Sequence, residues 1–542
     1  MTSLQGHEAS NTLSLCGPLS NHSGLKTHHE QLAAIVPGLA GRSEGRYIAS
    51  LGSRLGRRHR GELADSNLRL VMAEPPTPVS NLSSISRPSS RVPLFAVSIL
   101  WFVLLFVSGG WGAELDALWP AWGVAFWSAA VWGVNLLLLY YGVGPPFSFG
   151  RIPLLSVTFA FLMTAFGSAS YWATTQLFPL YRVFIERAAL LVAVCTLLSL
   201  VVYLAVAHGS GARLRRRRWE FVWDWGRVRI LTYALLAASL LGTYVSVRRI
   251  GYIPVLQGDP ESLRFEFPAI GGLWYRLSML GTVVALVAGA QICARRANWP
   301  IWIAGALGLV CASAYGNRFF LALPLAAVLL LWDRVRRPIT MLTIALGFLV
   351  GVPVLALLGF WRQQVTGVDV LGPVALVLYG TLSEFRDLGW TMDYYSGGHA
   401  LLHGKTLGGL IVPLLPSPVW SLLGVNKGEV FAHSNAAVLA QEMGQITAQR
   451  VGIYGELFMN FGWLGALAGA CLYGALVAYV DRRFLAVRSG EPVRGIIIAV
   501  VAAATVYAQV GQWDMFTSAI TAYCYPILLI ALLATSRKAI AS

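Results

Sequence analysis

The chain has 542 residues, of which 56% are hydrophobic and only 12% are charged. A soluble protein spends about a quarter of its residues on charge, so this composition excludes a soluble globular protein and predicts an integral membrane protein. The net charge is +16, but the cations lie in a basic N-terminal stretch and in short groups between apolar runs. This pattern encodes orientation in a membrane, and we expect no nucleic-acid partner.

Residues 1–91 are rich in Ser, Gly, Arg and His and contain no sustained apolar run. Such a stretch cannot bury enough surface to offset the entropy of ordering, so we expect a disordered cytoplasmic tail. It also lacks the apolar core of a secretory signal before Pro93. Met72 is an alternative start, which would remove residues 1–71, and the functional interpretation is the same for both starts.

Apolar runs follow along the rest of the chain, and most reach the roughly 20 residues that cross a bilayer. They lie at about 93–111, 119–141, 152–173, 184–207, 228–247, 273–293, 299–316, 319–333, 339–360, 452–480, 494–512 and 515–535. We therefore predict an all-α integral membrane protein with about 12 transmembrane helices, helices 1–9 within 92–360 and helices 10–12 within 452–542. The tripeptide 316–318 is expected to form a tight hairpin between the seventh and eighth helices.

Cations between the runs predict the orientation. The groups are Arg213 with Arg215 to Arg218, Arg295 with Arg296, Arg334 with Arg336 and Arg337, Arg482 with Arg483, and Arg537 with Lys538. Counting crossings puts all of them on one side, which the positive-inside rule makes the cytoplasm, together with both termini. Two longer outer segments remain, 248–272 and a large extracytoplasmic loop, 361–451, between helices 9 and 10. Residues 369–382 of that loop are too short to span, and are interpreted as a packed or interfacial helix.

Arginines on the outer side are candidates for binding a diphosphate, because guanidinium groups bind phosphate in a bidentate manner and stay charged beside lipid. These candidates are Arg249, Arg264, Arg318, Arg362, Arg386 and Arg450. Pairing with neighbouring acids is the alternative for any one of them, as Arg264 with Glu261 or Arg386 with Glu384. A binding role is favoured for the set, because several border apolar segments where an idle charge is costly.

The candidate general bases are His433 and Glu384. His433 lies in a stretch expected to be a loop that leads into a helix, where an imidazole can take a proton from a hydroxyl near neutral pH. The alternative is a structural or solvated histidine, and His399 and His403 are the other histidines of the loop. Glu456 lies inside an apolar run, so it is either a functional residue or a hydrogen-bonded packing residue.

Motifs of several other functional classes are absent from the sequence. It contains no Walker loop, HExxH pair, nucleotide-binding glycine fingerprint or Asp-x-Asp pair, so no metal and no cofactor are predicted. The cysteines of the apolar segments show no metal-ligand spacing and are interpreted as small packing residues. They are Cys195, Cys293, Cys311, Cys471 and Cys524.

Two stretches resemble the bacterial O-antigen polymerases, also called oligosaccharide repeat-unit polymerases. The first runs from Arg248 to Leu277 and has the order of that family's outer-loop motif: Ile253-Pro254, an acidic turn, Arg264-Phe265 and a glycine pair. The second is GIYGELFMNFGWLGALAGACLYG, similar to the family's Gly-Glu-x-x-x-Asn-Phe-Gly segment after the large outer loop. The hairpin at 316–318 matches the family's small residue and arginine, and the similarities cover about 228–480.

The resemblance implies an enzyme that elongates a glycan on the outer face of the bacterial cytoplasmic membrane. A chain on undecaprenyl diphosphate would be transferred to the non-reducing end of a new lipid-linked repeat unit, and the lipid diphosphate would leave. The outer arginines would bind the diphosphate, and His433 or Glu384 would deprotonate the acceptor hydroxyl. The implied partners are the lipid-linked oligosaccharide, the bilayer, a chain-length regulator and a flippase.

Three other functions are alternatives to a polymerase. An O-antigen ligase-like glycosyltransferase needs the same diphosphate-binding arginines, the same access for the lipid and the same outer loop. The sequence therefore does not separate it from a polymerase. A transporter or flippase of lipid-linked oligosaccharides predicts polar residues throughout the spans and an internal repeat, and neither is evident. A scaffold would not explain arginines kept at the outer face.

Overall fold

The computed structural model describes residues 120–143, 150–175, 182–209, 223–254, 260–315, 319–339, 343, 384–415, 417–426, 438, 451–488, 490–509, 511 and 513–535. All of these residues fall within 87–542. They are almost entirely helical, and the described residues contain no strand beyond an isolated bridge between Trp223 and Thr535. The predicted tail, 1–91, lies outside them.

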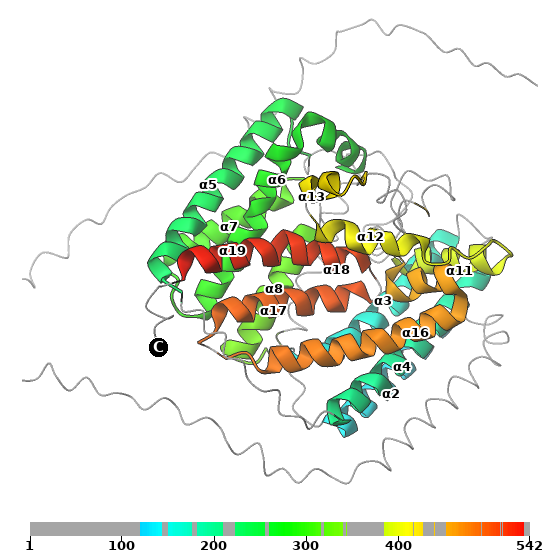
Figure 1. Cartoon of the computed structure of the whole chain (residues 1–542). Helices are drawn as coiled ribbons and strands as arrows, with labels where there is room; N and C mark the ends of the chain where they lie inside the picture. Colours follow the sequence, from blue (N-terminus) through cyan, green and yellow to red (C-terminus); the bar gives the residue numbers. More distant parts are fainter. Residues whose placement is uncertain are drawn as a thin grey trace, which may run out of the picture. The chain divides into compact units, whose positions relative to one another are not determined.

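Helices occupy the described parts of the apolar runs, and further short helices lie between residues 384 and 422, within the predicted outer loop (Figure 1). The first seven are α2 Pro120–Val143, α3 Ile152–Thr175, α4 Arg182–Gly209, α5 Trp225–Ile250, α6 Pro260–Cys293, α7 Trp299–Ser313 and α8 Phe319–Val335. The later ones are α11 Glu384–Ser396, α12 Gly408–Ile411, α13 Ser417–Leu422, α16 Gly452–Leu485, α17 Pro492–Ala508, α18 Trp513–Ala519 and α19 Tyr525–Ala534. The run 93–111 and nearly all of 339–360 lie outside the described residues.

Five helices in the described part are long and apolar enough to cross a membrane. They are Ile185–His208, Trp225–Ile250, Gly272–Cys293, Gly452–Leu485 and Phe516–Ala534. Large apolar side chains are exposed on them and on their neighbours, including Tyr244 on α5, Trp299 on α7 and Leu532 on α19. A soluble surface rarely exposes so many large apolar groups, whereas a bilayer covers them.

The predicted outer segment 248–272 is helical at both ends, although the membrane-length part of α6 begins only at Gly272. Helix α5 continues to Ile250, so Arg248 and Arg249 occupy its last turn, and α6 already begins at Pro260. Gly251 ends α5 with φ 88°, and its amide donates to the Val247 carbonyl at 2.8 Å, which is a common helix stop. Proline favours the first position of a helix because it has no amide hydrogen to leave unbonded there.

Small residues bring α5, α6 and α7 close together. A Cβ atom placed on Gly281 of α6 would lie 2.3 Å from the Gly308 carbonyl oxygen of α7, so the two backbones are almost in contact. The Ser239 hydroxyl of α5 also donates to the Ser278 carbonyl of α6, at 2.7 Å. Small residues and short hydroxyl bonds of this kind are how helices associate where lipid removes the hydrophobic driving force.

A buried hydroxyl network joins α3, α4, α16 and α17. The Tyr454 hydroxyl lies 2.9 Å from Ser199 Oγ, and the Tyr473 hydroxyl lies 3.0 Å from Ser156 Oγ. The Gln509 side chain donates to the Tyr454 hydroxyl at 3.3 Å. Because these groups are buried, a lost hydrogen bond is not replaced by water, so the network holds α16 against α3, α4 and the end of α17.

Arginines bind the ends of neighbouring helices at one end of the bundle. Arg334 of α8 donates to the Leu485 carbonyl at the end of α16, and Arg482 of α16 donates to the Val206 carbonyl near the end of α4. Arg229 near the start of α5 donates to the Arg296 carbonyl just after α6, at 2.8 Å. Cations at helix C-termini satisfy the last carbonyls and favour the helix dipole. The predicted cationic groups around 295–296, 334–337 and 482–483 are thus carried by helix ends that contact one another.

Two buried carboxylates at this end hold the start of α3. Asp333 of α8 accepts from the Gly150 amide at 2.8 Å, and Asp481 of α16 accepts from the Ile152 amide at 3.2 Å. The Tyr203 hydroxyl of α4 also donates to Asp481, at 2.9 Å. Amides at a helix N-terminus have no partner within the helix, so acidic side chains from two other helices supply one.

Candidate functional site

Helix α16 is broken at Gly462, inside the Gly-Glu-x-x-x-Asn-Phe-Gly segment. The backbone there has φ 67° and ψ −156°, a conformation that is open to glycine and almost closed to other residues. A break of this kind removes the helical bonds that would cross it, so backbone carbonyls before Gly462 need other partners. An apolar spanning helix tolerates such carbonyls only where protein or water satisfies them.

The loop after α11 supplies those partners. The Leu402 amide donates to the Met459 carbonyl at 3.0 Å, and the His403 amide donates to the Asn460 carbonyl at 3.0 Å. The Gly404 amide continues the series by donating to the Asn460 side-chain oxygen at 2.8 Å. Three successive amides of the loop are therefore fixed on the break by hydrogen bonds.

A chain of three buried side chains lies beneath this loop. The Asn460 amide donates to the Thr406 hydroxyl at 2.7 Å, and that hydroxyl donates to a Glu456 carboxyl oxygen at 3.0 Å. Asn460 and Thr406 are completely buried, and Glu456 is 3% exposed. An ionisable group this deep in an apolar helix is costly and marks a functional candidate. We call Glu456, Asn460, Gly462, His403 and Thr406 the break site.

The glycines after the break have a role that the sequence did not reveal. Small residues in a membrane helix often admit another helix, but a Cβ atom on Gly465 or Gly469 would meet Leu457 of α16 itself, at 2.4 and 2.3 Å. They allow the second half of α16 to pack on the turn before the break. Gly474 is the residue that admits a neighbouring helix, because its Cβ would lie 2.2 Å from the Ser199 carbonyl of α4.

His403 combines exposure with an uncommon backbone conformation. Its φ is 47°, a left-handed value that is rare outside glycine, and Gly404 follows with φ 87°. The side chain is exposed beside the break, while its amide is held by the Asn460 carbonyl. Strained residues held by their surroundings concentrate at functional sites. His403 is therefore the described histidine best placed to act on a group bound at the break site.

The site lies far along α16 from the arginine-rich end of the bundle. Arg482 follows Glu456 by 26 residues, which corresponds to at most about 39 Å of helix. The hydrocarbon core of a bilayer is about 30 Å thick. The break site and Arg482 are thus separated by enough helix to reach opposite membrane surfaces.

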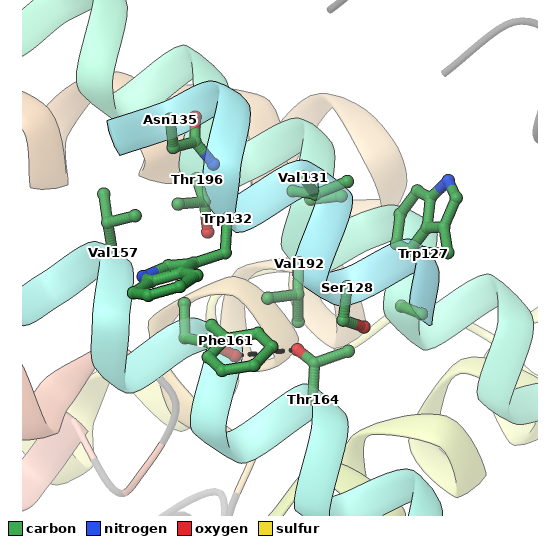
Figure 2. A pocket seen from close by; sticks show the side chains of 13 residues that line it. Trp127, Ser128, Val131, Trp132, Asn135, Val157, Phe161, Thr164, Val192 and Thr196 are labelled. Carbon is green, nitrogen blue, oxygen red and sulfur yellow. Dashed lines mark hydrogen bonds between the residues drawn. The ribbon is translucent and has the colours of Figure 1, made fainter. Parts of the chain in front are cut away.

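A cavity between α2, α3 and α4 is too small to be the substrate site. Figure 2 shows its walls, where the Trp132 and Phe161 rings stack with centroids 5.0 Å apart. The free space is about 20 Å³, enough for one water molecule and far too little for a sugar. One wall is formed by Thr196, whose hydroxyl accepts from Gln509 at 3.3 Å, so the cavity borders the buried hydroxyl network.

Most of the predicted site residues fall where their side chains are not described. His433, Arg318, Arg362 and Arg450 lie outside the described residues, as does the segment 369–382. Glu384 and Arg386 lie in the first turn of α11, and Arg264 lies near the start of α6; only their place in the helix is described. Arg249 is exposed in the last turn of α5. The diphosphate cradle and the two predicted bases therefore stay predictions.

The sequence does not predict that the residues of the break site lie together. Glu456 was singled out alone, because a charge in an apolar run is conspicuous, whereas Thr406 and Asn460 carry no such signal. In the described part no group of three or more His, Cys, Asp or Glu side chains is arranged to hold a metal ion. The five described cysteines are free thiols, four of them buried, in agreement with their predicted packing role.

The Thr406 hydroxyl is expected to matter more for stability than an equally buried threonine nearby. Thr406→Val removes the hydroxyl that accepts from Asn460 and donates to Glu456, and the loss of these buried hydrogen bonds costs about 1–3 kcal/mol. Thr391→Val is the control, because Thr391 is also fully buried but bonds only to the Asp387 carbonyl of its own helix. Thermal unfolding of the purified full chain in detergent measures both, and equal melting temperatures would contradict the assigned role.

Comparison with known proteins adds no family assignment: no family model, no curated protein sequence and no solved structure matches the chain.

Proposed function

We propose that the chain is a membrane glycosyltransferase that polymerises undecaprenyl-diphosphate-linked oligosaccharide repeat units on the outer face of the bacterial cytoplasmic membrane. One observation carries the proposal. The segment that resembles the polymerase family, Gly455 to Gly462, coincides with the segment where a spanning helix breaks and buries a carboxylate. Motif and unusual geometry agree on the same residues, and that agreement supports the assignment of a site there.

The proposed topology has about 12 transmembrane helices with both termini in the cytoplasm. It is supported by contacts among the ends of four helices: Arg334, Arg336 and Arg482 donate to carbonyls at the ends of α16, α6 and α4. By the positive-inside rule these ends face the cytoplasm. The break site, in the N-terminal part of α16, then faces outward. The large loop 361–451 would then lie on the outer side, where lipid-linked repeat units are polymerised.

The proposed reaction transfers a glycan from a lipid diphosphate to a sugar hydroxyl. The acceptor hydroxyl loses its proton to a base, its oxygen bonds the anomeric carbon of the donor, and the bond from that carbon to the diphosphate oxygen breaks. The lipid diphosphate leaves with the electron pair, and the predicted outer arginines neutralise the charge that develops on it. His433 and Glu384 remain the predicted bases, and His403 joins them because of its place at the break site.

A transporter of lipid-linked oligosaccharides is the second candidate, and the break itself favours it. Broken helices that hold ionisable groups also form the binding sites of secondary transporters. A ligase-like glycosyltransferase shares the chemistry of the proposed polymerase and differs only in its acceptor. The fate of the lipid-linked intermediates separates the three.

Deletion of the gene is expected to remove long surface polysaccharide and leave single repeat units on their normal final acceptor. A polymerase acts between repeat-unit synthesis and chain transfer, so its loss stops the process at one unit. Gel separation of the surface polysaccharide and of the lipid-linked intermediates measures this. Polymer that accumulates on undecaprenyl diphosphate would point to a ligase, single units retained inside the membrane to a transporter, and an unchanged profile would refute all three.

His403→Asn is expected to lower the polymerisation rate by about 10²- to 10⁴-fold, the usual range for loss of a general base. Asparagine tolerates the positive φ of this position, so the substitution keeps the loop conformation and changes only the side chain. His208→Asn is the matched control, because His208 is an exposed histidine at the far end of α4. Ladder formation in membranes with matched protein levels is the readout, and a normal ladder from His403→Asn would return the role to His433 or Glu384.

A further inference from the structure

Helix α11 packs against α3, α4 and α16 through one apolar face. Phe385, Leu388 and Met392 of that face are almost completely buried. Leu388 lies directly on α16, since a Cβ atom on Gly455 would be 2.7 Å from its side chain. The short helix is therefore fixed beside the break site, and its opposite face is left partly open.

The open face carries a stack of three nearly parallel rings. Trp390 and Tyr394 are one helical turn apart, with ring centroids 5.8 Å apart and planes 16° apart. His399 lies on Tyr394, with centroids 3.7 Å apart and planes 11° apart. Gly398, at φ 104°, turns the chain after α11 so that His399 can reach back onto the helix. Trp390 and Tyr394 are half-buried, while His399 is exposed at the end of the stack.

Charged groups border the stack. Asp393 borders the face of Trp390 and Tyr394, because it lies three residues after Trp390, nearly one helical turn away. Partial burial raises the pKa of the Asp393 carboxyl, and the charge of Arg187 on α4 opposes that rise. Arg187 itself is exposed. The face thus combines flat aromatic surface with an acceptor of hydroxyl hydrogens and a donor to hydroxyl oxygens.

The stack and the break site are close to each other along the chain. His399 precedes Leu402 by three residues, and Leu402 is bonded to the Met459 carbonyl at the break. Three residues reach at most about 11 Å between Cα atoms. A ligand of the size of one or two sugar rings on the stack would therefore extend to the break site.

We propose that the face of Trp390, Asp393, Tyr394 and His399 is a subsite that binds a sugar ring of the acceptor repeat unit. The proposal rests on the proposed function. A pyranose has an apolar face of C–H groups that packs on an aromatic plane and a rim of hydroxyls that bonds charged side chains. The ring extends the stack on the exposed face of His399, with Asp393 and Arg187 beside it, and the sugar hydroxyl to be glycosylated points toward the break site.

An aromatic anchor at the membrane surface is the alternative explanation of these rings. Trp and Tyr are enriched there because each has an apolar body and a polar edge. Anchoring requires no particular arrangement of rings, so it does not explain why His399 stacks in parallel on Tyr394. It also gives no role to Asp393 and Arg187 beside the stack. A measurement of sugar binding distinguishes a binding stack from an anchor, and substitutions that preserve a ring plane distinguish it from a proton-transfer residue.

The test is a titration of the purified full chain in lipid nanodiscs with oligosaccharide released from the host's own surface polysaccharide by partial acid hydrolysis. Saturation-transfer NMR measures binding without turnover. His399→Ala is expected to weaken binding by about three- to tenfold, the usual value of one aromatic contact, whereas His399→Phe retains it. Trp390→Leu and Trp390→Phe form a second pair with the same expectation, and His208→Ala should bind like the wild type.

Unweakened binding by His399→Ala and Trp390→Leu would overturn the subsite, as would absence of binding by the wild type. Equal loss in His399→Ala and His399→Phe would also overturn it, because the ring plane would then not be what matters. Binding that follows the ring plane in a protein without polymerising activity would support the subsite and contradict the proposed function. The two failures are therefore distinguishable.

Discussion

The hydrogen bonds from Leu402 and His403 to the carbonyls of Met459 and Asn460 are the contacts on which the outer part of the molecule depends. A break at Gly462 exposes backbone carbonyls within an apolar helix, where each unsatisfied group costs several kcal/mol. The loop cannot leave without leaving those carbonyls unpaired. A break in one helix thereby fixes the backbone of a loop that is distant in sequence.

From this constraint the arrangement of the functional groups follows. The docked loop buries Thr406 against Asn460 and Glu456, exposes His403 beside the break, and holds His399 over α11. The first half of α16 is held in turn by the Tyr454 hydroxyl, which bonds to α4 and α17. Local backbone geometry, a buried polar chain and an exposed aromatic face are thus parts of one assembly, and a polymerase would need such rigidity to align donor and acceptor.

The apolar runs predicted where the described membrane-length helices lie, because runs of that length leave few alternatives. The predicted cationic groups at 295–296, 334–337 and 482–483 lie at helix ends that contact one another. The start of α6 at Pro260 was not predicted, since charges such as Glu261 and Arg264 resemble a loop. The sequence did not predict the break site. Gly462 is one of many glycines in its helix, and the bonds of Met459 and Asn460 to residues 402–404 join segments more than 50 positions apart. Contacts of that range carry no periodic signal.

Reconstitution of the purified chain in lipid vesicles with undecaprenyl-diphosphate-linked repeat units separates polymerisation at the break site from transport. We expect the wild-type chain alone to lengthen the lipid-linked glycan into a ladder and to release undecaprenyl diphosphate. We expect Gly462→Ala, which cannot easily adopt the backbone angles of the break, to lose the ladder. Movement of single repeat units between leaflets without any ladder, or a normal ladder from Gly462→Ala, would contradict polymerisation at the break site.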